Sequence, residues 1–576
     1  MAESFDTVAA ELLQSIYGHV PDVLARGIEA MIGDNPSGSD ATGQPSLWDH
    51  RDVVLITYAD QIRQQGHHPL AALRSFLVDH KLPSLIDCVH LLPFNPYTSD
   101  DGFSVVDYLA VDPDSGTWED IEDLGLATDL MFDLVLNHCS QKHEYFQKYL
   151  AGDPAYADFF IDQDPAADLS AVIRPRSLPL LSPYQAGDGT TRHIWTTFSA
   201  DQVDLNYENP NVMLAMLQTL VEYARRGARI IRLDAIAFLW KELGTTCLHL
   251  PQTHAAVKLM RRVLDLAVPG TLVLTETNVP HKENISYFGD GTDEAHMVYQ
   301  FSLPPLMLDA IHSGQTDTLR DWMASLQPPS DQTTFFNFTA SHDGVGVRPL
   351  EGLVSDDRID RLVDVVRRHQ GRVNMRAMSD GTERPYEMNI TYVDAVADRS
   401  VVPPSEHSRR FLATQAVMLA MQGMPAIYFH SLVGSPNDIE GMERSGQNRR
   451  INRHKYERSV LETRLDEPDG LQRRIFGGFQ QLLRLRRQQP AFHPSAPQSV
   501  LDLPTDGTLG FVRTSADGQP LVSLCNLSDQ VRRVDSKAIT QALGGEDGFD
   551  LVADQAIDAT SAIDLRPYQV RWLVPK

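Results

Sequence analysis

The sequence predicts an α/β fold: a (β/α)8 TIM barrel that carries two inserted loop domains and a C-terminal β domain. Two observations predict the barrel. Four apolar runs each end abruptly in polar or ionisable residues, as buried strands do where their C-terminal ends open into a site, and barrel enzymes build their active site from such strand ends. Between the runs lie stretches with helical period, such as 212–225 and 254–266.

The run at 229–238 reads Arg-Ile-Ile-Arg-Leu-Asp-Ala-Ile-Ala-Phe. Side chains alternate along a strand, so Arg232 and Asp234 share one face. Opposite charges in so apolar a run are costly unless they pair, and the arginine would keep the aspartate ionised and nucleophilic. A structural ion pair is the simpler interpretation of an isolated Arg-x-Asp. A site is favoured here because three more runs follow the same pattern: 133–138, 272–277, and 335–340 leading into Ser341-His342-Asp343.

Eight barrel strands are expected, in chain order: 53–58, 88–93, 131–136, 229–233, 271–275, 297–301, 335–340 and 426–430. Two helices, 8–17 and 21–31, are expected before the first strand. The C-terminal β domain is predicted by short strand-like runs: 509–513, 521–525 and 570–574.

Two gaps, after the third and seventh strands, are too long for simple connections and predict inserted domains. The expected division, in chain order, is as follows: a first barrel part with the N-terminal helices (1–138), an inserted domain (139–204), the middle of the barrel (205–344), a second inserted domain (345–404), the last barrel part (405–490) and the C-terminal β domain (491–576).

The net charge of −27 argues against nucleic acids and anionic membranes as partners. The sequence has no run of 18 apolar residues, so no membrane span is expected. Its N-terminus is polar, so no signal peptide is expected. The 4 cysteines show no paired spacing, so a reducing, cytoplasmic location is expected. The carboxylates are dispersed over strand ends rather than grouped in a calcium-binding loop, so no metal or cofactor is expected. Nothing in the sequence indicates an oligomeric state.

The four strand ends resemble the four short sequence regions of the α-amylase superfamily of glycoside hydrolases. The resemblance implies that Asp234 is the nucleophile, Glu276 the general acid/base, and Asp343 a third carboxylate that grips the sugar hydroxyls. Three residues match the family's supporting positions: His138, Arg232 and His342. Retaining glycoside transfer needs two carboxyl groups about 5–5.5 Å apart, one ionised and one protonated, so their environments must push their pKa values apart.

Further motifs resemble the sucrose-phosphorylase branch of that superfamily: 89–94, 101–103, 173–176, 202–204, 302–306, 342–346 and 451–453. This resemblance, which runs from about 53 to 456, implies a retaining α-glucoside phosphorylase, in which inorganic phosphate takes the glucosyl group. It implies that Asp101 and Arg453 close on the far side of the glucose, that Phe198 forms a stacking wall with Gln202 near the sugar, and that Arg176 reaches the phosphate. Each of these residues also has a simpler interpretation. Asp101 could belong to an ordinary turn, Phe198 could be a core residue, and Arg176 could lie in a solvated basic patch.

The acceptor loop departs from the sucrose phosphorylases. Tyr386 matches and is expected to contact acceptor and phosphate, but Glu387 stands where glutamine is usual and Arg384 where an aspartate would bind fructose. Arg376 and Arg384 would suit an anionic acceptor, as in glucosylglycerate or sucrose 6′-phosphate. Glu383 and Glu387 could instead neutralise them and leave a pocket for a neutral polyol. Glucosylglycerol is therefore the preferred substrate, with glucosylglycerate, sucrose 6′-phosphate and sucrose as alternatives.

Two other classes of function remain open. One is a hydrolase of the same fold acting on α-glucosides, which would release glucose without phosphate. The other is a non-catalytic sugar-binding protein on an inactive barrel. The complete set of Asp234, Glu276 and Asp343 argues against the second, because a binding protein needs no acid/base pair.

Overall fold

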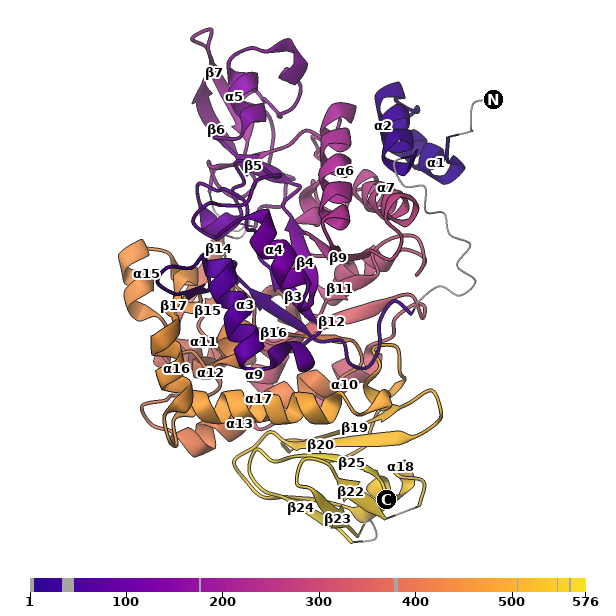
Figure 1. The fold of residues 1–576 in the computed structure, drawn as a ribbon, viewed down its shortest axis with the longest axis vertical. Coiled ribbons are helices and arrows are strands. Elements are labelled where there is room, and N and C mark those ends of the chain that lie inside the picture. The colour runs from indigo at the N-terminus through magenta and orange to yellow at the C-terminus, as the bar shows by residue number, and fades with distance from the viewer. Residues whose placement is uncertain are drawn as a thin grey trace.

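The computed structural model describes residues 5–33, 46–175, 178–377, 382–504, 506–545, 547–558 and 561–576. Its centre is a closed barrel of parallel strands, in the order β1-β16-β12-β11-β10-β9-β4-β3 (Figure 1). Its eight strands are β1 (Val54–Thr57), β3 (Cys88–Leu91), β4 (Asp129–Leu134), β9 (Ala228–Leu233), β10 (Leu272–Thr275), β11 (Met297–Tyr299), β12 (Thr334–Phe338) and β16 (Met424–Tyr428). All eight correspond to predicted strands, so the predicted fold class is confirmed.

The bounds of all eight strands differ from the predicted ones by one or two residues, mostly because the apolar runs continue past the hydrogen-bonded ladder. The third barrel strand ends at Leu134 rather than at position 136. The carbonyl oxygen of Leu136 accepts a hydrogen bond from the Tyr207 hydroxyl at 2.7 Å instead of from a neighbouring strand. The eighth strand ends at position 428, and the short helix α14 (Phe429–Leu432) follows at once. Burial alone therefore does not mark where a strand stops pairing.

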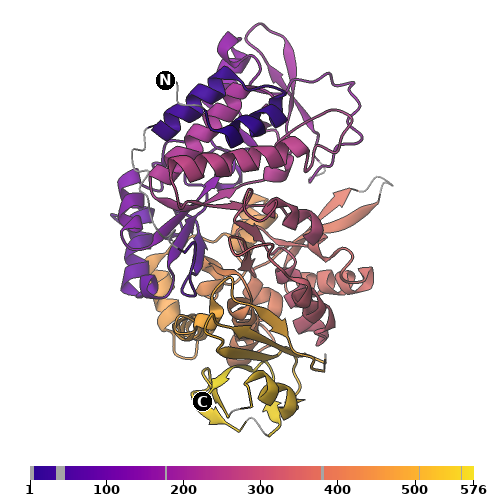
Figure 2. The ribbon, with the colours of Figure 1, turned by 90° about the vertical axis from the view of Figure 1, so that its right-hand side faces the viewer.

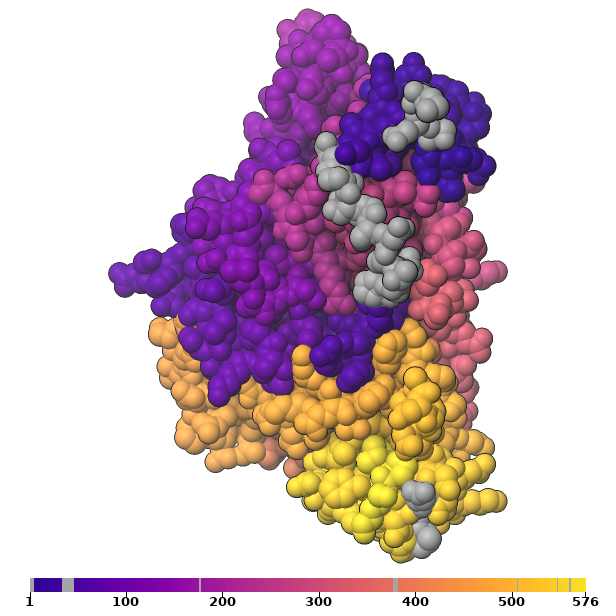
Figure 3. All heavy atoms as spheres, turned by 45° about the vertical axis from the view of Figure 1, so that its right-hand side comes forward, coloured from indigo at the N-terminus to yellow at the C-terminus, as the bar shows by residue number. Residues whose placement is uncertain are grey.

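Helices surround the barrel, among them α3 (Pro69–Asp79), α6 (Pro210–Arg225), α7 (Pro251–Ala267), α9 (Leu303–Ser313), α13 (Pro404–Ala420) and α17 (Leu471–Arg486). The predicted N-terminal helices are α1 (Thr7–Tyr17), which packs on α7, and α2 (Asp22–Gly33), which packs on α6. Figure 3 shows this N-terminal pair lying against the outside of the barrel. Arg262 of α7 pairs with Asp6, the N-cap of α1, at 2.5 Å. Among the described residues, no helix is long and apolar enough to cross a membrane.

Two insertions project beyond the strand ends. The first lies between β5 (His138–Ser140) and β8 (Gln202–Asp204), which pair antiparallel, and holds helix α5 (Glu144–Leu150) and the hairpin of β6 (Leu181–Gln185) and β7 (Thr191–Trp195). The second carries β13 (Val345–Gly346), α11 (Asp356–Arg368), β14 (Arg372–Ala377), β15 (Glu383–Asn389) and α12 (Tyr392–Val396). The β14–β15 hairpin stands out from the body of the molecule in Figure 2. The acceptor loop of the sequence thus lies on a hairpin rather than on an irregular loop.

The C-terminal part is a six-stranded sheet in the order β18-β19-β20-β25-β22-β23 beside a two-stranded one, at the foot of Figure 1. The predicted strand-like runs are β19 (Thr508–Thr514), β20 (Pro520–Asn526) and β25 (Val570–Pro575). The helix α18 (Ser536–Ala542) was not predicted; Asp535 caps it by accepting from the Lys537 N–H at 2.7 Å. We keep the proposed division into domains, with its boundaries, as a proposal.

Candidate active site

The C-terminal ends of the barrel strands open into one pocket. Asp234 follows β9 directly, Glu276 follows β10 directly, and Asp343 lies in the turn after β12. All three carboxylates line the pocket. Other residues that line it are Asp100, Phe103, His138, Phe198, Gln202, Asn278, His342, Arg348, Tyr386 and Arg449. The structure thus brings together side chains that lie far apart in the sequence.

The carboxylate of Asp234 lies in a buried ionic network. Arg232 Nη1 donates to Asp234 Oδ1 at 2.8 Å and also donates to Asp133 Oδ1. His90 Nε2 lies 2.6 Å from the other oxygen of Asp133. The predicted pairing of Arg232 with Asp234 is confirmed. Among the described residues no hydrogen bond holds Oδ2 of Asp234, so this oxygen is available for chemistry.

Glu276 is tied to the turn that follows Asp234. The backbone N–H of Ala235 donates to Glu276 Oε2 at 3.0 Å, and Ala235 has a positive φ of 50°. A left-handed backbone at a residue with a side chain is strained, and strain of this kind is found at functional sites. The turn thus fixes the position of Glu276 relative to Asp234.

Burial favours a proton on this carboxyl pair. Burial raises the pKa of both Asp234 and Glu276, and the charge of Glu276 raises that of Asp234 further. Arg232 is hydrogen-bonded to Asp234, whereas its Nη2 lies 4.0 Å from Glu276 Oε1. We therefore place the negative charge on Asp234 and the proton on Glu276, the arrangement that one nucleophile and one acid require.

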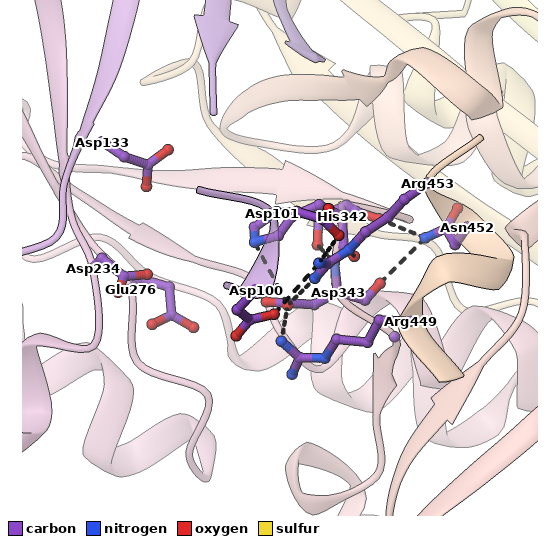
Figure 4. A network of polar contacts seen from close by, with 12 residues as sticks. Asp100, Asp101, Asp133, Asp234, Glu276, His342, Asp343, Arg449, Asn452 and Arg453 are labelled. Carbon is purple, nitrogen blue, oxygen red and sulfur yellow. Dashed lines mark hydrogen bonds and ion pairs between the residues drawn. The ribbon is translucent and has the colours of Figure 1, made fainter. Parts of the chain in front are cut away.

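The third carboxylate, Asp343, is held by cations. Arg449 Nη1 lies 2.6 Å and Arg453 Nη2 3.7 Å from Asp343 Oδ1 (Figure 4). Burial favours the neutral form of Asp343, but Arg449, with His342 and Arg453, outweighs it and holds the pKa below its usual range. Asp343 is therefore ionised whenever the enzyme is folded near neutral pH.

The prediction for Asp101 needs a correction. Asp101 pairs with Arg453 at 2.8 Å as predicted, but also with Arg450 at 2.9 Å, and it is not on the wall of the catalytic pocket. Its neighbour Asp100 lines the pocket. Both aspartates have positive φ, 52° and 51°, and both contact Arg453 Nη1, Asp101 at 2.8 Å and Asp100 at 3.4 Å. The predicted turn therefore reaches the pocket through Asp100, and a contact of Asp101 with the glucose stays a prediction.

Four other predicted residues line the pocket: His138, Phe198, Gln202 and His342. The His138 ring packs against Phe198, with centroids 5.2 Å apart, and Gln202 Nε2 lies 3.2 Å from His138 Nε2. His342 stacks on Phe103 at 4.7 Å and 8°. Burial lowers the pKa of His138 to about 4 and that of His342 to about 3, so both rings are neutral at pH 7.

The predicted acceptor residues are only partly on the pocket wall. Tyr386 lines it. Glu387 is buried behind the wall, where it accepts from Arg449 at 2.7 Å. Arg376 pairs with Glu351 and Arg384 lies 3.5 Å from Asp356, and neither lines the pocket. Both turn toward carboxylates of the inserted segment itself, so the structure does not bring them to the described pocket wall, and their contact with the acceptor stays a prediction.

Arg176, predicted to bind phosphate, lies outside the described residues, as do positions 378–381 of the acceptor loop.

Three pocket features were not predicted from the sequence. Arg449 bridges Asp343 and Glu387; its signal was the cluster of Arg449, Arg450 and Arg453 in an acidic chain. Arg348 lines the pocket from the segment after β13. Asn278 lines it two residues after Glu276. An arginine and an asparagine in loops carry no pattern of their own, so only their position in the fold marks them.

A buried lysine supports the pocket from behind. Lys241 Nζ lies 2.7 Å from both Asp204 Oδ2 and Asn137 Oδ1. Asn137 Nδ2 in turn lies 3.2 Å from His138 Nδ1. This network joins the β5–β8 pair of the first insertion to the segment after Asp234, and it fixes the ring of His138.

Comparison with known proteins places this geometry among carbohydrate-active enzymes. Residues 85–349 match the α-amylase catalytic-domain family. A glucosylglycerate phosphorylase of Escherichia coli strain K12 is 46% identical over 527 residues, which cover 91% of this chain and 92% of that protein. A protein of the same name from Allomeiothermus silvanus is 44% identical over 576 residues, 99% of this chain and 100% of that one. The crystal structure of sucrose 6F-phosphate phosphorylase from Thermoanaerobacter thermosaccharolyticum aligns with a TM-score of 0.72 and 25% identity, over 85% of this chain and 95% of that chain.

Proposed function

We propose that this chain, which belongs to the glycoside phosphorylases of the α-amylase family, transfers the glucosyl group of glucosylglycerate to inorganic phosphate. The products are α-glucose 1-phosphate and glycerate. The observation that carries the proposal is the 46% identity to a glucosylglycerate phosphorylase over 91% of this chain. A glucosylglycerol phosphorylase of Marinobacter adhaerens is 29% identical over 76% of this chain.

Glucosylglycerol, the substrate preferred from the sequence, is therefore replaced by glucosylglycerate. The preference rested on Glu383 and Glu387 neutralising Arg376 and Arg384. In the structure Glu387 is engaged by Arg449 instead, and the two loop arginines have partners elsewhere. The premise of a pocket made neutral by that loop no longer holds.

The proposed reaction is a double displacement that begins at Asp234. Oδ2 of Asp234 attacks the anomeric carbon while the bond to the glycerate oxygen breaks, and Glu276 gives its proton to that oxygen. A covalent glucosyl-enzyme and free glycerate result. Arg232 holds Oδ1 of Asp234, which directs the other oxygen to the sugar.

Phosphate completes the reaction from the same side. A phosphate oxygen attacks the anomeric carbon, its proton passes to Glu276, and the bond to Asp234 breaks. Two inversions retain the α configuration. We assign Tyr386 and Arg176 to phosphate, as the sequence predicts. With both substrates small, no protein or cofactor partner is required.

Ionised Asp343 and the neutral rings of His138 and His342 are proposed to bind the glucose hydroxyls. Asp100 and Gln202 lie on the same wall and complete a polar lining, and Phe198 provides an apolar face for the ring. We also place the enzyme in a reducing compartment, the cytoplasm, because its cysteines are all buried and free: Cys88, Cys139, Cys247 and Cys525.

The test is a panel of four α-glucosides, glucosylglycerate, glucosylglycerol, sucrose and sucrose 6′-phosphate, each with and without phosphate. ³¹P NMR should detect α-glucose 1-phosphate, fastest from glucosylglycerate and only when phosphate is present. Release of free glucose at the same rate without phosphate would identify a hydrolase instead. Faster turnover of glucosylglycerol would contradict the choice of acceptor while leaving the phosphorylase assignment intact.

A further inference from the structure

Arg348 is a pocket-lining arginine without a polar partner among the described residues. It opens the short helix that follows β13, η6 (Arg348–Leu350), and it lies on the wall with Glu276, Asn278 and Tyr386. Its Nε is buried and makes no hydrogen bond within the described part of the chain. A buried donor left unpaired costs free energy, so a ligand is the natural partner for this group.

The other arginines around the pocket are already engaged. Arg232 forms ion pairs with Asp133 and Asp234. Arg449 forms ion pairs with Asp343 and Glu387, and Arg453 forms one with Asp101. Each of these is held by carboxylates of the protein. Within the described residues, Arg348 has no such carboxylate within ion-pair distance, so its charge is available to an anion from solution.

The backbone holds Arg348 in a fixed place beside Tyr386 and Asn278. The N–H of Val347 donates to the carbonyl oxygen of Tyr386 at 2.9 Å, which joins this segment to β15. The Ser302 hydroxyl donates to the carbonyl oxygen of Pro349 at 3.2 Å. The same segment packs closely on Asn278, because a Cβ added at Gly346 would lie 2.9 Å from Asn278 Oδ1. A guanidinium on so constrained a segment is preorganised for a ligand.

Asn278 offers the second half of such a site. Its Oδ1 is buried and accepts no hydrogen bond from the described residues. It follows Glu276 by two residues, so it lies beside the acid that protonates the leaving oxygen. The groups that hold the glucose end, Asp343 and its arginines, come from other strand ends. The wall formed by Asn278 and Arg348 therefore belongs to the leaving group.

We propose that Arg348 binds the carboxylate of the acceptor, with Asn278 accepting a hydrogen bond from the acceptor's hydroxyl. The proposal rests on the proposed function, since glycerate carries a carboxylate and a free hydroxyl beside the oxygen that is glycosylated. An arginine fork matches a planar carboxylate and gives a charge-assisted pair. Phosphate is an oxyanion that enters the same space after glycerate leaves, so it draws on the same positive charge.

The experiment uses α-glucosyl fluoride as donor, so that the glucosyl-enzyme forms without any anionic acceptor. Transfer to glycerate, glycerol and phosphate is then measured for wild type, Arg348→Met and Arg348→Lys. In Arg348→Met the ratio of kcat/KM for glycerate to that for glycerol should fall roughly 10- to 150-fold, the loss expected for one charge-assisted contact. Arg348→Lys should recover part of the ratio. Arg367→Met, which removes an exposed arginine of α11 outside the pocket, is the matched control and should keep the wild-type ratio.

An accompanying loss with phosphate is expected and supports one oxyanion subsite used in succession. Equal losses with glycerate and glycerol, or a loss confined to phosphate, would overturn the proposal. The proposed function is tested separately by the wild-type enzyme. If wild type prefers glycerol to glycerate, the choice of substrate fails. If wild type prefers glycerate and Arg348→Met keeps that preference, only the role of Arg348 fails.

Discussion

The carboxylate of Asp343 depends for its charge on residues that come from another part of the barrel. It follows β12, whereas Arg449 and Arg453 lie in and beside η7 (Asn448–Asn452), which comes after β16. Arg449 also reaches Glu387 of the β14–β15 hairpin. A single guanidinium therefore joins the Asp343 carboxylate to the β14–β15 hairpin.

Replacing Arg449 should move the acid limb of the activity profile. Because Arg449 is the largest influence that lowers the pKa of Asp343 against burial, Arg449→Met should raise that pKa. Asp343 must be ionised, so kcat/KM should begin to fall at a higher pH than in wild type as the solution is acidified. The ionised Asp343 also stabilises the folded state, because its pKa is lowered on folding. This stabilisation is fully present above the unfolded pKa of about 3.9, and it is lost as the pH falls through the folded pKa.

The measurement is kcat/KM from pH 4 to 9 for both enzymes. Arg450→Met removes a neighbouring arginine that pairs with Asp101 rather than Asp343, and should leave the acid limb in place. An unchanged acid limb in Arg449→Met would show that Asp343 is kept ionised by something else.

At the scale of elements, the buried ion pair of Lys241 holds the first insertion onto the barrel. The side chain of Lys241 is 4% exposed and that of Asp204, on β8, is fully buried. Removing one partner of such a pair leaves the other charge buried and unpaired, which lowers the free energy of unfolding by about 3–5 kcal/mol. Lys241→Met should therefore lower the melting temperature clearly, whereas Lys282→Met, at an exposed position, should not.

Addition of Asp204→Asn to Lys241→Met should recover part of the lost stability, because the unpaired negative charge of Asp204 is then removed. Calorimetry of the single and double variants measures this. Equal melting temperatures for Lys241→Met and wild type would mean that the pair contributes nothing to the attachment of the insertion.

The barrel strands could be predicted because strands buried on both faces are continuous apolar runs, and because four of these runs end in polar or ionisable residues. Asp234, Glu276 and Asp343 were found for the same reason. Asp100 was missed because two adjacent aspartates in a turn look alike in the sequence, and only their position in the fold shows which one lines the pocket. Arg348 was missed because a single arginine before a proline reads as a surface residue.

The side-chain partners within the second insertion could not be predicted either. Arg376 and Arg384 were assigned to the acceptor because the segment that holds them resembles the acceptor loop of the sucrose phosphorylases. Their actual partners, Glu351 and Asp356, lie about 25 to 28 positions earlier in the chain. Pairing between distant positions depends on how the hairpin folds back over the inserted segment, and no local pattern records it.

At the scale of the whole molecule, a chain of net charge −27 gathers several arginines around its catalytic pocket. Most of the arginines near the pocket are balanced by carboxylates, and Arg348 adds a charge that the described residues do not balance. This arrangement makes a strongly acidic chain compatible with the proposed binding of phosphate and glycerate.

The barrel is also braced from outside. The N-terminal helices pack on α6 and α7, the two helices that flank the strand leading to Asp234. On the opposite side, buried Arg513 of β19 donates to the carbonyl oxygens of Ala420 and His493, both at 2.7 Å, and so joins the C-terminal sheet to α13 and the barrel. Such contacts hold strand ends in register, which a site assembled from several strands requires.

The most direct test is to trap the glucosyl-enzyme. Glu276→Gln should still react with α-glucosyl fluoride, whose leaving group needs no proton, but should discharge the glucosyl group slowly. Mass spectrometry of a digest should then find one anhydroglucose unit on the peptide that contains Asp234, and Asp234→Asn should carry none. Added phosphate should remove the label as α-glucose 1-phosphate. A label on another residue, no label at all, or discharge only to glucose in the presence of phosphate would contradict phosphorolysis through Asp234.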